Sequence, residues 1–596
     1  MRDIIPGQAI KFEMPEKDFD VFVIETEGKD LTQAIAAAWK TVLPSFNTKI
    51  NDPAVPFIDD NFDECAEQIY KSDDAAFILA FAKRKNDKIW VVILSGSQDA
   101  REKRSSQISS CIGSLTIPGM KKEDLSQRPL KSIRANEAQL GQFITHAMRE
   151  LQVPGLSIAL VEDGKIVFER GYGVKKWGEQ NPVNEHTLLK IGSISKSMTT
   201  LLMAKLVEEG RFGWRSKAQT LYPAFRVGDE ALSKSLEMEQ LASASTGLPR
   251  KDAAHAFNYR NKTIFQQLSA TKPTTKPKET FQYNNQIVTA AGYIAAHTVY
   301  PEKSMDQAFC DVMSEKVFRP MGMARTTFIP QDNFAFPHSE TIEGEVTSLT
   351  LQDDEETDFS KPAGGIWSSA HDMGLYVITE LNGGVNARRE RVFDEQTLKH
   401  RRTPQVNVGH NSSYGLGWAI DVQKGLTQIG HGGRTSGFAS LLGFYPEKKC
   451  GFVMLTNGLG GDSLNWAIRR KLLELWFDTS EKSSETLAAT LQELKKGIAE
   501  NRKKLSAPYP DWISPFLGKH HNEELGFFDI TQEKGGYFLD ANSGLYKARL
   551  MTHEGHKGET TLACANPGGI RLIPIEVNSF KIMEAQHSYE FKKVAE

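Results

Sequence analysis

The chain has 596 residues, of which 40% are hydrophobic and 25% are charged, a length and composition typical of a globular protein with several cores. Lysine and arginine number 72 against 75 aspartates and glutamates, so the net charge of −3 favours neither nucleic acid nor an anionic membrane as a partner. No uninterrupted apolar stretch is long enough for membrane insertion, and the first residues lack the apolar core of a signal peptide. Localisation therefore stays unknown, because a cytoplasmic protein and an exported protein that has lost its signal fit equally well.

Cysteine and histidine spacing gives no sign of a metal site. The five cysteines are scattered, odd in number and without Cys-x-x-Cys spacing, which predicts neither a disulfide framework nor zinc binding. His553 and His556 are one residue too close for a helical pair of zinc ligands and have a glycine between them. We therefore expect no metal and no cofactor, and we interpret His520 and His521 as an exposed pair.

Residues 1–130 are predicted to form a small α+β accessory domain without a catalytic constellation. The expected elements are a strand at 20–25, a helix at 31–40, a hairpin from 76–81 to 89–94 and a helix near residue 107. A charged linker from 121 to 134 is expected to follow this domain.

The central part of the chain opens with two predicted strands joined at Asp163-Gly164, a dipeptide typical of tight hairpins. Ser193 then precedes Lys196 by three residues at the start of an apolar helical pattern, a spacing that makes the two side chains neighbours. A desolvated lysine with a lowered pKa can take the proton of a serine hydroxyl. Serine also caps helices, so the motif alone leaves that alternative open. A second match, at 269–272, precedes a proline and has no helix to align it.

Two later segments provide candidate partners for this pair. Tyr283 and Asn285 lie two residues apart, so a phenol and an amide can face the same side of an extended segment. The amide can hold the lysine amine, and the phenol can relay a proton to a leaving group. The glycines of His431-Gly432-Gly433-Arg434 would let a substrate approach a strand edge and leave an amide for an oxyanion hole. A glycine-rich hairpin corner is the alternative interpretation.

In this order, the three segments resemble the serine β-lactamase and penicillin-binding-protein superfamily, and most of all its class C branch, peptidase family S12. That branch includes D-aminopeptidases, D-Ala-D-Ala carboxypeptidases and family VIII esterases. The resemblance covers roughly residues 135–477. Its further matches are Ser245-Thr-Gly-Leu-Pro249, Arg319-Pro-Met-Gly-Met323, Ala363-Gly-Gly-Ile-Trp-Ser-Ser-Ala-His-Asp372 and Tyr414-Gly-Leu-Gly-Trp418.

The resemblance implies a two-step acyl transfer through an ester on the nucleophile. By this resemblance Ser193 is the nucleophile, Lys196 its general base and Tyr283 the residue that shuttles a proton. The implied chemistry requires neither a metal nor a cofactor.

The remaining matched residues would hold the substrate. Asn285 is expected to orient the lysine and to meet a substrate carbonyl. The backbone amides of Ser193 and Arg434 would form the oxyanion hole, and His431 and Gly433 would line the opposite wall.

Departures from the β-lactamase pattern narrow the expected substrate. His431 stands where class C β-lactamases and most penicillin-binding proteins carry a lysine, and a histidine is mostly neutral near pH 7. Histidine here is similar to the D-aminopeptidase group, so efficient β-lactam turnover is not expected. Ala244 stands where the corresponding segment of the family usually has a histidine, a change expected to affect local packing. The Arg434 side chain is either a cation near the pocket or, more simply, a solvated hairpin charge.

Residues 481–510 are predicted to be a helical linker, and 511–596 a domain of short strands separated by glycine and asparagine turns. This last domain resembles the lipocalin-like β-barrel appended to several peptidases of the family. By analogy it would cover the active-site mouth, restrict substrate size or support oligomerisation.

The sequence thus predicts an α/β (α+β) multidomain protein with a β-lactamase-like core at 135–480, built from an antiparallel sheet flanked by helices and an all-helical subdomain. The expected function is that of a serine hydrolase, a peptidase or amidase acting on small or D-configured peptides. A carboxylesterase and a weakly active structural member of the family are the alternatives. The expected partner is a small peptide, amide or ester substrate, and homo-oligomerisation is left open.

Overall fold

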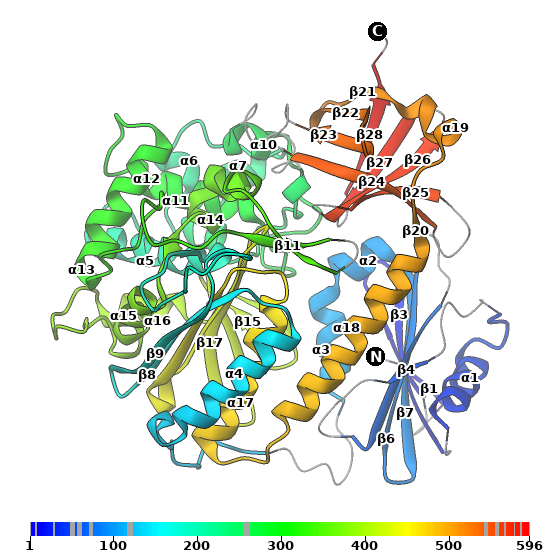
Figure 1. Cartoon of the computed structure of the whole chain (residues 1–596), viewed down its shortest axis with the longest axis horizontal. Coiled ribbons are helices and arrows are strands. Elements are labelled where there is room, and N and C mark those ends of the chain that lie inside the picture. The colour runs from blue at the N-terminus through cyan, green and yellow to red at the C-terminus, as the bar shows by residue number, and fades with distance from the viewer. Residues whose placement is uncertain are drawn as a thin grey trace. The chain divides into compact units, whose positions relative to one another are not determined.

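The structure, a computed structural model, divides into two compact units. The first consists of Met1–Asp124 with the short segments Asn407–Ser412 and Glu554–Glu559, and the second of the remaining chain (Figure 1). The structure describes residues 2–5, 9–27, 30–47, 54–56, 62–70, 76–115, 123–253, 263–341, 344–541, 546–554, 560–565, 568–576, 578–584 and 587–594. Within these ranges, no helix combines the length and the apolar character needed to cross a membrane.

The first unit is built on a seven-stranded antiparallel sheet with helices on both faces. In spatial order the strands are β1 (Arg2–Ile5), β2 (Ala9–Glu13), β3 (Phe19–Glu27), β7 (Lys88–Ser97), β6 (Ala76–Lys85), β5 (Glu64–Ile69) and β4 (Val55–Pro56). Helix α1 (Leu31–Val42) packs on the face that carries Phe22 and Ile24, and α2 (Gln98–Lys103) and α3 (Ser105–Gly113) pack on the face of Val21 and Val23. This alternation is the two-residue period of a strand, and the predicted α+β domain is confirmed.

The core of the second unit is an antiparallel sheet. In spatial order it contains β15 (Ser412–Tyr414), β16 (Ala419–Gln423), β17 (Leu426–Arg434), β18 (Ala439–Tyr445), β19 (Cys450–Thr456), β8 (Gly155–Glu162) and β9 (Lys165–Gly173). Strand β14 (Val406–Gly409) falls almost wholly in a segment assigned to the first unit. The turn between β8 and β9 is the predicted one, because Asp163 and Gly164 both have positive φ values, 46° and 72°.

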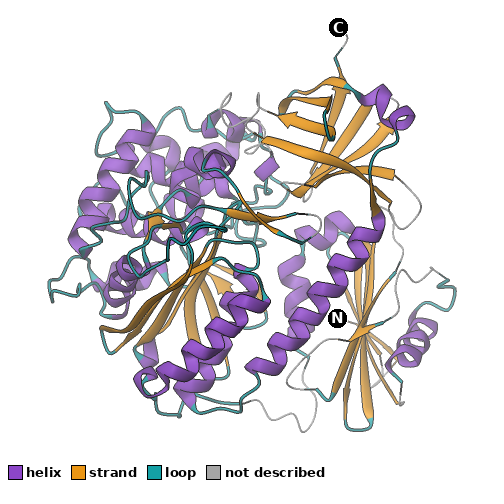
Figure 2. Ribbon diagram, in the orientation of Figure 1, coloured by secondary structure: helices purple, strands orange, loops and turns teal. Residues whose placement is uncertain are grey.

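Helices cover both faces of this sheet, as Figure 2 shows. One face packs against α4 (Glu137–Glu150) and α17 (Gly461–Phe477), and the other against the helical subdomain. That side contains α5 (Ser195–Glu208), α6 (Ala218–Leu221), α7 (Glu230–Ser235), α8 (Met238–Ala242), α10 (Ile264–Ala270), α11 (Asn285–His297), α12 (Met305–Met313), α13 (Arg319–Met321), α14 (Lys361–Gly364), α15 (Ala370–Leu381) and α16 (Glu395–Arg401). Short strands β10 (Leu189–Lys190) and β13 (Trp367–Ser368) form one pair, and β11 (His338–Glu340) and β12 (Val346–Ser348) form another.

Helix α18 (Ser483–Lys504) leads to a closed antiparallel barrel of eight strands. These are β21 (Gly518–Asn522), β22 (Gly526–Glu533), β23 (Gly536–Ala541), β24 (Tyr546–Glu554), β25 (Thr560–Ala565), β26 (Gly568–Glu576), β27 (Ser579–Glu584) and β28 (His587–Lys593). Pairing of β24 with β25 closes the barrel, and the short strand β20 (Leu505–Ser506) adds to β24. The predicted lipocalin-like domain is thereby confirmed.

The interpretation of His520 and His521 as an exposed pair was wrong for the first of them. His520 is fully buried, and its ring stacks on Phe528 with 5.1 Å between ring centroids. Successive residues of β21 point to opposite sides of the barrel wall, so one of two adjacent histidines must face the interior. Burial lowers the pKa of His520 to about 4, which keeps its ring neutral. His556 lies outside the described residues.

Candidate active site

The Ser193 segment is a single helical turn, Gly192–Ile194, which runs directly into α5. Gly192 has φ = +51°, and a Cβ added there would lie only 2.6 Å from the Arg434 backbone nitrogen. Only glycine tolerates both the conformation and the contact. The tight packing presents the partly exposed Ser193 beside the end of β17.

Lys196 lies one turn into the same helical segment, as its spacing predicts. Its Nζ is 2.9 Å from Ser193 Oγ and donates a second hydrogen bond to the Ala363 carbonyl at 2.8 Å. The side chain is 1% exposed, and this burial lowers the pKa of Lys196 to about 7, with Asp252 opposing the shift and Arg250 adding to it. An amine with such a pKa is partly neutral at neutral pH and can accept a proton from the serine.

Tyr283 lies two residues before α11 and closes the other side of the pair. The Lys196 Nζ lies 4.8 Å from the centroid of the Tyr283 ring. Burial raises the pKa of Tyr283 above its ordinary value, and a hydrogen bond with the Ser193 side chain opposes the rise only in part. The phenol therefore keeps its proton at neutral pH and can act as a proton donor.

Asn285 has a partner that the sequence did not indicate. Its Nδ2 donates to Asp252 Oδ1 at 2.8 Å, whereas the two hydrogen bonds that the structure gives to the Lys196 amine go to Ser193 and Ala363. The expected orientation of Lys196 by Asn285 is thus not seen in these contacts. Asp252 lies three residues after the Ser245–Pro249 match, and this proximity is the only sequence signal for it.

His431 is buried on β17 and is neutral. The Tyr414 hydroxyl donates to its Nε2 at 2.9 Å, which leaves the proton on Nδ1 to be donated to the Gly432 carbonyl. Burial, reinforced by the charge of Lys196, lowers the pKa of His431 to about 4. The residue at the third motif therefore supplies no positive charge to a substrate at neutral pH.

Gly433 and Arg434 place the end of β17 against the serine segment. A Cβ added to Gly433 would lie 1.9 Å from the Ile191 carbonyl oxygen, so the close approach depends on glycine. The Arg434 side chain is 61% exposed and its Nη1 lies 3.3 Å from Asp462. The side chain is thus the solvated charge of the simpler interpretation, and its backbone amide is the part next to the serine segment.

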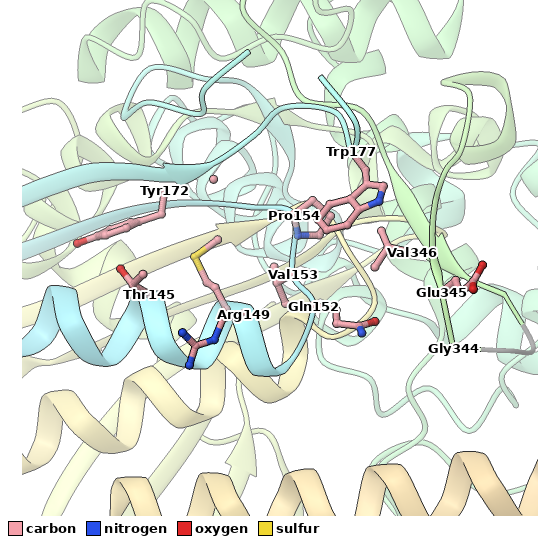
Figure 3. A pocket seen from close by; sticks show the side chains of 12 residues that line it. Thr145, Arg149, Gln152, Val153, Pro154, Tyr172, Trp177, Gly344, Glu345 and Val346 are labelled. Carbon is pink, nitrogen blue, oxygen red and sulfur yellow. The ribbon is translucent and has the colours of Figure 1, made fainter. Parts of the chain in front are cut away.

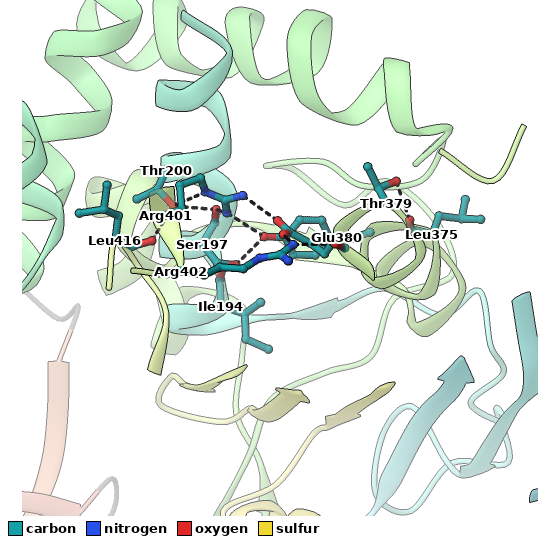
Figure 4. A network of polar contacts seen from close by, with 10 residues as sticks. Ile194, Ser197, Thr200, Leu375, Thr379, Glu380, Arg401, Arg402 and Leu416 are labelled. Carbon is teal, nitrogen blue, oxygen red and sulfur yellow. Dashed lines mark hydrogen bonds and ion pairs between the residues drawn. The ribbon is translucent and has the colours of Figure 1, made fainter. Parts of the chain in front are cut away.

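The structure also contains a buried ionic network that the sequence analysis missed (Figure 4). Arg401 is fully buried, and its guanidinium contacts Glu380 at 2.7 Å, Thr200 Oγ1 at 3.2 Å and the Ser197 carbonyl oxygen. Arg402 pairs with the same glutamate. Because Ser197 and Thr200 belong to α5, this network holds the helix that carries Lys196.

A second buried cation lies just before Ser193. Lys190 contacts the carboxylates of Asp354 at 3.1 Å and Asp358 at 2.9 Å, and donates to the Asp354 carbonyl oxygen at 2.7 Å. Burial alone would lower the pKa of Lys190, but the two carboxylates outweigh it and the net direction is upward. Lys190 thus stays charged and its role is structural.

A cavity of about 830 Å³ lies in another part of the second unit (Figure 3). It is bordered by the end of α4, by β9 around Tyr172, by Trp177 and by residues 344–346. Its lining contains neither Ser193 nor Lys196 and is mostly apolar. The chemistry described above is therefore separate from this cavity.

Comparison with known proteins fits this geometry. The family model described as Beta-lactamase matches residues 140–474. The chain belongs to this family. The octameric penicillin-binding protein homologue from Pyrococcus abyssi superposes with a TM-score of 0.51 and 20% identity, over 77% of this chain and 100% of that one, which shows a common fold.

Curated relatives are distant. Protein flp of Staphylococcus aureus (strain MW2) is 23% identical over 328 residues, 54% of this chain and 63% of that protein. The unguisins hydrolase ungD' of Aspergillus campestris is 23% identical over 350 residues, 56% of this chain and 63% of that protein. The chain thus matches less than two thirds of the length of these relatives.

Proposed function

We propose that the protein is a serine hydrolase that forms a covalent acyl-enzyme on Ser193, and that it is a peptidase or amidase acting on small or D-configured peptides. The observation that carries this proposal is the contact between the buried Lys196 amine and Ser193 Oγ at 2.9 Å. A neutral amine in this position converts a weak nucleophile into an effective one. Membership of the family, and a relative named as a hydrolase, support an enzymatic role.

The contacts support the following acylation step. Neutral Lys196 accepts the Ser193 hydroxyl proton while Oγ attacks the substrate carbonyl carbon. The backbone amides of Ser193 and Arg434 stabilise the negative charge that develops on the carbonyl oxygen. The tetrahedral intermediate collapses as Tyr283 gives a proton to the leaving nitrogen, and the acyl-serine ester remains. In the second step the Tyr283 phenolate takes a proton from a water molecule, which attacks this ester, and the Lys196 ammonium returns its proton to Ser193 Oγ, so that all three side chains regain their starting states.

Two features narrow the substrate class, the first in favour of amides over esters and the second against β-lactams. An amine leaving group must be protonated before it departs, and the raised pKa of Tyr283 keeps a proton available for that purpose. The neutral, buried His431 offers no permanent cation where β-lactamases of class C carry a lysine. The neighbour from Pyrococcus abyssi is described as octameric, which supports the further proposal that this chain self-associates.

Covalent labelling tests the proposal. A fluorophosphonate probe should modify one serine, and peptide mapping by mass spectrometry should identify it as Ser193. Ser193→Ala should lose both labelling and turnover while it keeps the thermal unfolding transition of the wild type, because the hydroxyl contributes to chemistry more than to packing. Labelling at a different residue, or full turnover by Ser193→Ala, would overturn the assignment of the nucleophile.

Side-by-side turnover tests the substrate class. D-aminoacyl p-nitroanilides, p-nitrophenyl esters and nitrocefin should be compared at equal enzyme concentration. We expect nitrocefin to be the poorest of the three. Rapid nitrocefin hydrolysis would contradict the role given to the neutral His431, and hydrolysis of esters alone would identify a carboxylesterase.

A further inference from the structure

One charged side chain near Tyr283 belongs to none of the three motifs. The guanidinium carbon of Arg250 lies 5.6 Å from the centroid of the Tyr283 ring, and the side chain is 52% exposed. Its charge reaches the reacting groups, because it adds to the lowering of the pKa of Lys196 and opposes the rise in the pKa of Tyr283. Arg250 therefore combines access to solvent with proximity to the catalytic side chains.

The other basic groups at this site are unsuited to binding an anion. His431 is neutral, and the charge of the Arg434 guanidinium acts on Asp462 and Glu340 and not on Lys196 or Tyr283. Lys196 is buried and already donates to Ser193 and Ala363. Arg250 is thus a permanent cation that lies beside the catalytic side chains and is also accessible to a substrate.

The Arg250 side chain is held in a fixed orientation. Its Nε contacts Asp252 Oδ2 at 2.5 Å, and no described residue hydrogen-bonds to Nη1 or Nη2, so the edge that carries these two atoms is open to another partner. That edge matches the two oxygens of a carboxylate, and a guanidinium fixed in advance loses little freedom on binding. A carboxylate such as Asp252 can accept several hydrogen bonds, and here it accepts one from Asn285 as well.

The C-terminal barrel fixes the Asp252 segment from the opposite side. Glu584, at the end of β27, accepts hydrogen bonds from the backbone amides of Asp252 and Ala253, the second at 2.8 Å. Lys251 is buried and pairs with Glu524 of the barrel at 2.7 Å. These contacts connect residues more than 270 positions apart in the chain, so the barrel contributes to the position of Arg250.

We propose that Arg250 is a specificity-determining residue that binds a free carboxylate of the substrate through its Nη1 and Nη2 atoms, in an orientation set by Asp252 and the barrel residue Glu584. The proposal deepens the proposed function and rests on it. The substrate class is then a small peptide, amide or ester that carries a carboxylate close to its scissile bond.

Matched pairs of substrates test this assignment. On the acyl side, p-nitrophenyl hemisuccinate carries a carboxylate and p-nitrophenyl butyrate does not. On the leaving-group side, D-alanyl-D-alanine carries one and D-alanyl-D-alaninamide does not. We expect the wild type to prefer the anionic member of at least one pair, and Arg250→Gln to reduce this ratio of kcat/KM values about tenfold or more, since hydrogen bonds to charged groups are among the stronger ones.

Two further variants make the result specific. Arg250→Lys keeps the charge but loses the planar edge, so it should retain only part of the preference. Arg388→Gln removes an exposed arginine that pairs with Glu390, and it should leave the ratio unchanged. The pair that responds identifies the side of the scissile bond on which the carboxylate binds.

Failure of this inference can be told apart from failure of the proposed function. If Arg250→Gln is labelled by the fluorophosphonate probe at Ser193 but neither ratio changes, Arg250 does not bind the substrate carboxylate and the inference is overturned. A wild-type preference for the uncharged members of both pairs would overturn it as well. Absence of labelling in the wild type would instead overturn the serine mechanism.

Discussion

Two buried lysines flank Ser193, and their surroundings differ in one respect. Lys190 and Lys196 are 2% and 1% exposed, six positions apart in the chain. Lys190 has two carboxylate partners, Asp354 and Asp358, which hold its pKa above the ordinary value. Lys196 contacts a hydroxyl and a carbonyl oxygen, and its pKa falls to about 7. Lys196 becomes a base here because, among the described residues, no carboxylate contacts its amine and Asp252 offsets the effect of burial only in part, whereas a paired lysine at equal depth stays a structural cation.

The first turns of α5 show the same contrast between a buried cation that pairs with a carboxylate and one that does not. The Arg401 network fixes Ser197 and Thr200 with a guanidinium that pairs directly with the Glu380 carboxylate. The Lys196 amine, which contacts no carboxylate among the described residues, therefore belongs to a helix that the Arg401 network anchors one turn further along. Fixed surroundings prevent the desolvated amine from relaxing toward water, which is how an active site keeps a shifted pKa.

Replacing the unpaired lysine should have the largest effect on activity. Lys196→Met removes the proton acceptor, and general-base catalysis of this kind contributes about 10²- to 10⁴-fold, so kcat/KM should fall by roughly 10³-fold. The unfolding temperature at pH 7 should stay the same or rise, because a desolvated amine is exchanged for an apolar side chain of similar length. Steady-state kinetics and calorimetry measure the two effects. Substantial remaining activity would contradict the role of Lys196 as the base.

Replacing the paired lysine should instead affect stability. Lys190→Met leaves Asp354 and Asp358 without their cation, and breaking a buried ion pair in this way costs about 3–5 kcal/mol. Denaturant unfolding of the variant should show this loss, and Lys165→Met, at an exposed lysine of β9, should show little change. If the combined change Lys190→Met with Asp354→Asn and Asp358→Asn restores no stability, the loss is not due to the unpaired carboxylates.

The parts of this site that sequence predicts are those set by local geometry. Ser193 and Lys196 meet because residues three apart share a helical face, and the turn at Asp163-Gly164 follows from the positive φ values that it requires. These features need no knowledge of the rest of the chain.

The contacts that sequence reasoning missed are long-range or have no periodic pattern. Asp252 contacts Asn285, 33 positions away in the chain, and Glu584, 332 positions away. No local sequence preference predicts such a pairing. His520 was misplaced because its neighbours in β21 are polar on both sides, so alternation of apolar and polar residues could not identify the inward face.

The smallest expected effects concern the pH at which Lys196 becomes a base. Because the neutral amine is the active form and the pKa of Lys196 is about 7, the rate of Ser193 acylation should rise with pH, roughly tenfold between pH 6 and pH 8. Arg250 lowers this pKa, so Arg250→Gln should move the rising limb to higher pH. Asp252 raises it, so Asp252→Asn should move the limb to lower pH.

The rate of fluorophosphonate labelling can be measured across this pH range for the wild type, Arg250→Gln and Asp252→Asn. It reports the pH dependence of acylation in each protein without depending on substrate binding. Shifts of opposite sign would show that the Arg250 and Asp252 charges act on the amine directly, since a general loosening of the site would move both variants the same way. Identical limbs in all three proteins would mean that the titrating group is not Lys196. The comparison of the two lysines would then no longer explain how the serine is activated.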